Sequence, residues 1–156
     1  MITIDIPGRK TFHLEHLVLD FNGTLAVDGN LIDGVKERLQ ELSGKLSIHV
    51  ITADTFGTVA NQLKGINCHV KILEKEQQDR QKKIYIKQLG KKRCAAIGNG
   101  YNDWQMLKHA ALSIVTIQAE GASSQSLKHA TVVCYSVNHA LDLLLNPNRL
   151  VATLRR

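Results

Sequence analysis

Polar side chains follow three apolar runs of this sequence, at the points where buried strands are expected to end. They are Asp20 near the end of residues 16–21, Thr52 and Asp54 on either side of Ala53 at the end of residues 46–52, and Asn99, Asn102 and Asp103 after residues 93–97. In an open parallel sheet, ligands bind beyond the carboxyl ends of the strands. The shared placement of these groups therefore predicts a functional site.

The residue types fit phosphoryl transfer. The Asp20 carboxylate can attack phosphorus and form an aspartyl phosphate. Carboxylate and phosphate repel each other, so a cation is needed, and Mg²⁺ accepts oxygen ligands of the kind that Asp103 and Asn99 offer. The Thr52 hydroxyl can donate to a phosphate oxygen, and a lysine would neutralise the developing charge. Gly23 lets backbone amides turn toward the phosphate. The predicted partner is a phosphorylated substrate.

Each residue taken alone also has a structural interpretation. A strand-end Asp is usually a turn or helix cap, a strand-end Thr is a common β-former, and the Gly98-x-Gly100 spacing is an ordinary turn signal. Asn102 and Asp103 alone suggest the first turn of a helix. The joint placement of these residues at three strand ends favours the functional interpretation.

The elements that must position these groups alternate along the chain. Residues 2–6 and 11–14 alternate in hydrophobicity around Pro7-Gly8 and predict an N-terminal β-hairpin. Strands are expected at 16–21, 46–52, 68–73, 93–97, 112–117 and 131–135, and helices at 32–42, 55–64, 77–89, 102–109, 123–129, 137–145 and 147–154. Asp33 is the expected cap of the first helix. This order predicts an α/β fold with a mainly parallel sheet and helices on both faces, in one domain spanning 1–156.

Composition narrows the class of protein. The net charge of +6 comes from Lys and Arg spread over several segments, and aromatic residues make up 4% of the chain, so no nucleic-acid partner is expected. The three cysteines form no C-x-x-C pair and predict buried free thiols in a reducing compartment. The histidines show no metal-ligand spacing. With no signal-peptide pattern and no apolar run of about 20 residues, we expect a cytoplasmic protein without membrane contact.

Three segments resemble the motifs of the haloacid dehalogenase (HAD) superfamily. The run Asp20-Phe21-Asn22-Gly23-Thr24-Leu25 resembles the first motif, D-x-D-G-T-L, and Val50-Ile51-Thr52 resembles the second. The run Gly98-Asn99-Gly100-Tyr101-Asn102-Asp103 is similar to the fourth motif in the form shared with P-type ATPases. The run from Thr52 to Thr58 is also similar to the soluble P-type-ATPase-like branch. The resemblance covers nearly the whole chain and implies a Rossmann-like HAD core.

The resemblance implies a role for each matching residue. Asp20 would be the nucleophile and a Mg²⁺ ligand, and the main-chain carbonyl of Asn22 would be a second ligand. Asn99 and Asp103 would complete the metal site. The phosphoryl group would be held by the backbone and side chains of three further positions, namely Gly23, Thr52 and Ala53. The third-motif lysine falls at the start of residues 77–89, where counting favours Lys82, with Lys83 as the alternative.

Two departures from the family pattern affect the expected activity. Phosphatases of the family carry a general acid–base Asp where this chain has Asn22, and a neutral amide cannot do that work, which is typically worth about 10²–10⁴-fold. Asn99 stands where the fourth motif usually has an Asp, which weakens Mg²⁺ binding. Both predict slow turnover or a need for a good leaving group. The alternative is a degenerate relative that binds a phosphorylated ligand or a protein partner without turnover. A nucleic-acid-binding accessory domain is a weaker third hypothesis.

The spacing between motifs leaves no room for a cap domain. Residues 25–32 are long enough only for a small flap hairpin that turns at Asp28-Gly29. Uncapped members of the family act on large substrates or close their sites by association. We therefore expect a homo-oligomer.

Overall fold

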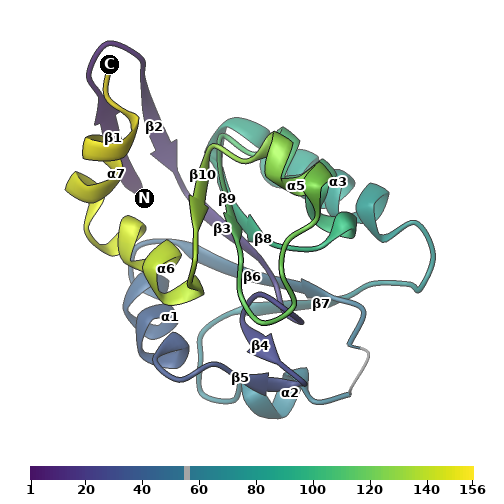
Figure 1. Cartoon of the computed structure of the whole chain (residues 1–156). Helices are drawn as coiled ribbons and strands as arrows, with labels where there is room; N and C mark the ends of the chain where they lie inside the picture. Colours follow the sequence, from purple (N-terminus) through teal and green to yellow (C-terminus); the bar gives the residue numbers. More distant parts are fainter. Residues whose placement is uncertain (55–56) are drawn as a thin grey trace.

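A computed structural model describes residues 1–54 and 57–156 of the chain. Its centre is a six-stranded parallel sheet in the order β10-β9-β8-β3-β6-β7 (Figure 1). The strands are β3 (His16–Asp20), β6 (Ser47–Thr52), β7 (His69–Ile72), β8 (Cys94–Gly98), β9 (Leu112–Thr116) and β10 (Val132–Cys134). The predicted α/β class and mainly parallel sheet are confirmed. β3 lies between β6 and β8, which brings the three predicted strand ends together.

Helices cover both faces of this sheet. They are α1 (Val35–Ser43), α2 (Val59–Gln62), α3 (Gln78–Leu89), α4 (Trp104–His109), α5 (Ser124–His129), α6 (Val137–Leu145) and α7 (Pro147–Leu154), with short 3₁₀ turns η1 (Lys91–Arg93) and η2 (Tyr101–Asp103). Leu17 and Leu19 of β3 pack into the core cluster of α1, α6 and α7, whereas Val18 packs toward α3 and α4. The apolar runs are thus strands buried on both faces.

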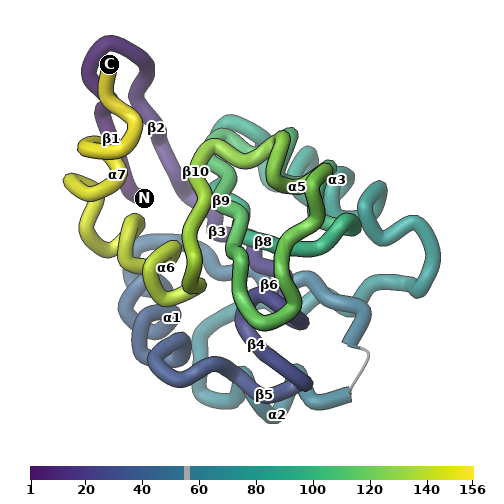
Figure 2. Tube along the Cα trace, in the orientation of Figure 1, coloured from purple at the N-terminus to yellow at the C-terminus, as the bar shows by residue number. Residues whose placement is uncertain are grey.

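The N-terminal hairpin is confirmed. β1 (Ile2–Ile6) pairs with β2 (Lys10–Leu14) in antiparallel register, and Ile4, Ile6 and Phe12 are buried on one face. The hairpin extends away from the main sheet beside α7, and the two ends of the chain lie close to it (Figures 1 and 2). The hairpin covers apolar surface of α7 that would otherwise face water.

The predicted flap is a two-stranded hairpin. β4 (Ala26–Val27) and β5 (Asn30–Leu31) pair around Asp28 and Gly29, whose φ angles are 50° and 78°. Two consecutive positive φ angles define the type I′ turn that matches the twist of a short hairpin. In the described part of the chain no inserted cap domain separates the motifs.

Two helix predictions need correction. The first helix begins at Val35 rather than near Ile32, and its N-cap is Gly34 instead of Asp33. Gly34 has φ 85°, a conformation that glycine adopts at little cost, so the chain enters the helix one residue later than the polar side chain suggests. The second helix, predicted over 55–64, is only Val59–Gln62, and Thr55 and Phe56 of that prediction lie outside the described residues.

Three histidines that are far apart in the sequence lie close together on the sheet. His16, His49 and His69 lie on the neighbouring strands β3, β6 and β7, with the His16 and His49 rings 3.1 Å apart between nitrogens and the His49 and His69 rings stacked at 5.0 Å. Side-by-side pairing of strands far apart in sequence gathers them, so sequence spacing gave no sign of the cluster. All three cysteines are free, but only Cys94 is fully buried.

Across the residues that the structure describes, none of the helices has both the length and the apolar character to cross a bilayer.

Candidate functional site

A small cavity opens at the carboxyl ends of β3, β6 and β8. Its volume is about 220 Å³, and its lining includes residues from all three strand ends. The lining residues are Asp20, Asn22, Thr52, Ala53, Gln78, Asn99, Gly100, Asn102 and Glu120. The structure thus brings the first, second and fourth motif segments to one hollow, as the strand order requires.

Asp20 and Asp103 are joined by a buried lysine. The Lys82 Nζ donates to Asp20 Oδ1 at 2.7 Å and to Asp103 Oδ1 at 2.6 Å. Lys82 and Asp103 are fully buried, and Asp20 is 6% exposed. Lys82 lies in the first turns of α3, on the helix face that packs against the sheet. Lys83 is only partly buried and takes part in no ion pair with the described residues.

Burial and mutual charge set the protonation of this ion triad. Burial, followed by the Asp103 carboxylate, raises the pKa of Asp20 to about 6, against the lowering effect of the Lys82 ammonium. Burial acts to lower the pKa of Lys82, but the two carboxylates outweigh it and raise that pKa above its usual value. Lys82 is therefore a fixed positive charge, and Asp20 is held as a carboxylate chiefly by its partners.

Asp103 is held by the backbone as well as by Lys82. Its Oδ2 accepts the amide hydrogens of Asn99 and Gly100, each at 2.9 Å. A β-carbon at Gly98 would lie 2.6 Å from the Asp103 Cγ, so this close approach requires glycine at 98. Three of the roughly four lone-pair directions of the Asp103 carboxylate are thus already used. Asp103 mainly orients Lys82 and the 99–100 turn in this arrangement.

Thr24 links the first and fourth motif segments. Its hydroxyl lies 3.1 Å from Asp20 Oδ2 and 3.1 Å from Asn99 Oδ1, and Thr24 is fully buried. The Asn99 side chain also donates to the Gly121 carbonyl at 3.0 Å. These contacts fix the free oxygen of Asp20 and the amide of Asn99 against each other.

Gly23 forms a cradle under two polar side chains. Its φ is 80°, and a β-carbon there would overlap the Glu120 carboxylate and the Asn99 amide. Glu120 is exposed, and it and Asp20 are the two carboxylates among the described residues that line the cavity. Only glycine lets both side chains lie over the turn that follows Asp20.

Thr52 lies at the end of β6 with its hydroxyl beside the cavity. The side chain is 2% exposed, and its oxygen accepts the Asp54 amide hydrogen at 3.0 Å, so the hydroxyl hydrogen is available to an acceptor in the cavity. Asp54 has φ 48°, an uncommon conformation for a residue other than glycine. Ala53 lines the same cavity between these two residues.

The donor set at this site fits a hard divalent cation. The Oδ1 atom of Asn22 is buried and has no hydrogen-bond partner among the described residues. Asp20, Asp103 and Lys82 together carry one net negative charge. The described residues hold no cluster of three or more His, Cys, Asp or Glu side chains at ligand spacing. A site with one or two carboxylates and additional amide and carbonyl oxygens suits Mg²⁺, because this ion keeps several of its water ligands.

Sequence reasoning missed three residues of this site. Glu120 and Gln78 line the cavity, and Thr24 bridges Asp20 and Asn99. Thr24 belongs to the first motif, and Glu120 follows a predicted strand at the same sheet edge, so their positions carried a weak signal. Gln78 accepts the Asn102 side-chain amide at 2.7 Å, a contact that only the packing of α3 beside η2 creates.

One family model and two curated proteins match parts of this chain. A model of haloacid dehalogenase-like hydrolases matches residues 81–140. An uncharacterized protein of Methanocaldococcus jannaschii is 52% identical over 64 residues, which are 41% of this chain and 69% of that protein. A second uncharacterized protein of the same organism is 49% identical over 39 residues, which are 25% of this chain and 89% of that protein.

Solved structures show the same fold along nearly the whole chain. A 3-deoxy-D-manno-octulosonate 8-phosphate phosphatase of Moraxella catarrhalis, in complex with magnesium, phosphate and the sugar acid, has a TM-score of 0.66 at 19% identity, covering 92% of this chain and 94% of that one. A putative phosphatase of the same kind from Vibrio cholerae has a TM-score of 0.71 at 14% identity, covering 94% and 96%. A cobalt-bound one from Haemophilus influenzae has a TM-score of 0.65 at 12% identity, covering 92% and 94%. The chain therefore belongs to a family that it shares with the two uncharacterized M. jannaschii proteins, and its residues 81–140 match the haloacid dehalogenase-like hydrolases.

Proposed function

We propose that this protein is a Mg²⁺-dependent phosphohydrolase that acts through an aspartyl phosphate at Asp20. The observation that carries the proposal is the buried contact of Lys82 with Asp20 and Asp103 at the edge of the cavity. A lysine that is fully buried between two carboxylates costs desolvation energy, and such an arrangement is typical of functional sites. The substrate class is a phosphate monoester or an acyl phosphate.

The reaction that these residues support has two steps. An Asp20 carboxylate oxygen attacks phosphorus, and the bond between phosphorus and the leaving oxygen breaks as the acyl phosphate forms. Water then attacks this phosphorus, which releases inorganic phosphate and returns the Asp20 carboxylate. Lys82 holds a positive charge beside the phosphoryl oxygens, and the Thr52 hydroxyl with the backbone at Gly23 and Ala53 orients them.

Mg²⁺ would supply charge neutralisation between the carboxylate and the incoming phosphate. Its proposed ligands in the first motif segment are the Asp20 carboxylate and the main-chain carbonyl oxygen of Asn22. In the fourth motif segment they are the Asn99 amide oxygen and the Asp103 carboxylate. Because Asp103 is engaged by Lys82 and two amides, we propose that Glu120 supplies part of the missing negative charge. From its position over Gly23 it can contact metal-bound water.

Asn22 makes hydrolysis the slow step in this proposal. The leaving oxygen of the first step and the water of the second both need a proton partner, and an amide cannot serve. A good leaving group needs no such help, so acyl phosphates and aryl phosphates should form the phosphoenzyme more readily than alkyl phosphates.

The comparisons support the reaction class at the level of the superfamily. The matched family model describes hydrolases, and the Moraxella catarrhalis structure holds magnesium and phosphate. Kinship with the soluble P-type-ATPase-like branch rests on the form of the first and fourth motifs and stays part of the proposal. Assembly into a homo-oligomer is also part of the proposal, and size-exclusion chromatography with light scattering would measure it.

The test is hydrolysis of p-nitrophenyl phosphate and acetyl phosphate with and without Mg²⁺. We expect slow Mg²⁺-dependent turnover that Asp20→Asn abolishes and that the matched surface variant Asp5→Asn leaves unchanged. Acid-quenched protein incubated with acetyl ³²P-phosphate should carry label on Asp20. Undiminished activity in Asp20→Asn, or no activity and no label in the parent protein, would contradict the proposal.

A second candidate function is favoured by Asn22 and Asn99 together. A degenerate relative would bind a phosphorylated ligand in the same cavity without turnover. Beryllofluoride with Mg²⁺ mimics the aspartyl phosphate, so calorimetry with this probe separates the two functions. Formation of the complex together with slow hydrolysis supports the enzyme, whereas tight binding of inorganic phosphate with no label on Asp20 supports the binding protein.

A further inference from the structure

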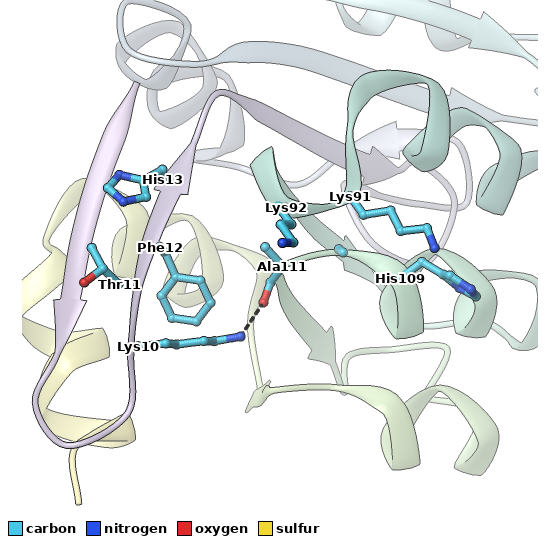
Figure 3. A pocket seen from close by; sticks show the side chains of 9 residues that line it. Lys10, Thr11, Phe12, His13, Lys91, Lys92, His109 and Ala111 are labelled. Carbon is cyan, nitrogen blue, oxygen red and sulfur yellow. Dashed lines mark hydrogen bonds between the residues drawn. The ribbon is translucent and has the colours of Figure 1, made fainter.

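A second hollow lies away from the Asp20 cavity. It has a volume of about 390 Å³ and lies where the N-terminal hairpin meets η1 and the link between α4 and β9 (Figure 3). We call it the basic pocket. Its lining residues are Lys10, Thr11, Phe12, His13, Lys91, Lys92, His109, Ala110 and Ala111.

The basic pocket is at the opposite end of the sheet from the Asp20 cavity. η1 leads directly into β8, and Ala110 and Ala111 lead into β9, so the pocket lies at the amino ends of these strands. Helix α3 runs from Gln78 beside the Asp20 cavity to Leu89 just before η1. At 1.5 Å per residue, that helix separates the two hollows by roughly 18 Å. One small ligand cannot occupy both, so the two sites can be studied separately.

The charged residues that line the basic pocket are all of one sign. Three lysines and two histidines line it, and no carboxylate is among its lining residues. Within the described chain, Lys10, Lys91 and Lys92 form no ion pair. Like charges gathered around one hollow repel each other, and low-dielectric walls strengthen the field inside it. An anion in the pocket would relieve that repulsion.

The floor of the basic pocket is apolar and one of its cations is held in place. Phe12 is 2% exposed, and Ala110 and Ala111 lie beside it. The Lys10 Nζ donates to the Ala111 carbonyl at 3.2 Å and stands 4.4 Å from the centre of the Phe12 ring (Figure 3). Holding a lysine in one position reduces the entropy that a ligand must overcome. An apolar floor beside a cation that is held in place suits an anion that carries a flat apolar group.

We propose that the basic pocket is a second ligand site, which binds a small organic phosphate or phosphonate dianion through Lys10, Lys91 and Lys92, with the apolar part of the ligand against Ala110 and Ala111 beside Phe12. The proposal stands apart from the function of Asp20. Lys91 and Lys92 follow the end of α3, whereas Lys10 comes from the hairpin, so the pocket exists only when the hairpin packs against the body of the fold.

The test uses ¹⁵N-labelled protein in EDTA and titrates it with phenylphosphonate, followed by amide NMR shifts. We expect saturable shifts at residues 10–13, 91–92 and 109–111. Methylphosphonate, which has the charge but no flat apolar group, should bind at least threefold more weakly. The Lys91→Ala/Lys92→Ala variant should raise the Kd about tenfold or more, because it removes two of the three cations that would contact the dianion.

The control variant is Lys64→Ala/Lys75→Ala, which removes the same charge from two exposed positions elsewhere. Its Kd should stay within twofold of the parent value. Equal weakening in both double variants would show a nonspecific charge effect and overturn the proposal. Shifts confined to the Asp20 cavity, or shifts that grow linearly without saturation, would also overturn it. Binding through the basic pocket in an Asp20→Asn background would show that the two sites are independent.

Discussion

The Lys82→Met variant removes the ammonium group between Asp20 and Asp103 while keeping most of the side-chain volume. Its partners lie at 2.7 and 2.6 Å, and Lys82 and Asp103 are fully buried. Removing one member of a buried ionic group leaves uncompensated charge, which typically costs about 3–5 kcal/mol. We therefore expect the free energy of unfolding at pH 7 to fall by about 3–5 kcal/mol.

Urea unfolding followed by circular dichroism, with EDTA present, measures this change. The matched control is Lys83→Met, one residue along the same helix, which should stay within about 0.5 kcal/mol of the parent because Lys83 is partly exposed and has no ion-pair partner in the described chain. The two substitutions remove the same charge from the same helix. The difference between them therefore isolates the buried contact.

The deficit of Lys82→Met should shrink as the pH falls toward 5. Without the ammonium, one of the two buried carboxylates has its pKa raised above the value in the unfolded chain. A raised folded-state pKa contributes stability at low pH that is lost as the pH rises through it. A deficit below about 1 kcal/mol at pH 7, or an equal deficit in Lys83→Met, would refute the assignment of Lys82 as the buried cation of the site.

Three further predictions concern neighbouring residues. Asn22→Asp should speed release of phosphate from labelled Asp20 by about 10²-fold or more, because it restores an acid–base group; an unchanged rate in single-turnover assays would show that this position does not limit hydrolysis. Glu120→Gln should weaken Mg²⁺ binding about 10-fold by calorimetry, as changes around a metal's ligands commonly do, whereas Glu41→Gln should not change it. Burial, with the charges of His16 and His69, lowers the pKa of His49 to about 4. As the pH falls, His49 is therefore protonated in the unfolded chain at a higher pH than in the folded chain. The free energy of unfolding of the parent protein should therefore fall by about 2–3 kcal/mol between pH 7 and pH 4.5, and that of His49→Gln should fall by less. Equal slopes of the free energy of unfolding against pH in the two proteins would contradict this.

The sequence by itself determined the elements and their order. Apolar runs of strand length, helical spacing and turn residues are local signals, and they predicted the parallel sheet, the N-terminal hairpin and the flap that turns at Asp28-Gly29. Local signals were weaker at helix ends. Asp33 has the side chain of a cap, but Gly34 has the backbone freedom that the entry into α1 requires, and the backbone decided the boundary.

The motif residues were also visible in the sequence, because parallel strands place their carboxyl ends at one edge of the sheet. Asp20, Thr52 and Asn99 were expected together for that reason, and they line one cavity. Their chemical roles stay predictions until the variants are measured.

Only the tertiary structure decided which side chains meet across the fold. Lys82 and Lys83 are neighbours in sequence, but successive helix residues point about 100° apart, so the packing of α3 buries one and leaves the other partly exposed. The positions of Glu120 over Gly23, of the histidines on three neighbouring strands and of Lys10 beside Lys92 depend on contacts between segments far apart in the chain. Such contacts leave no periodic trace in a sequence, because they arise from the packing of whole elements.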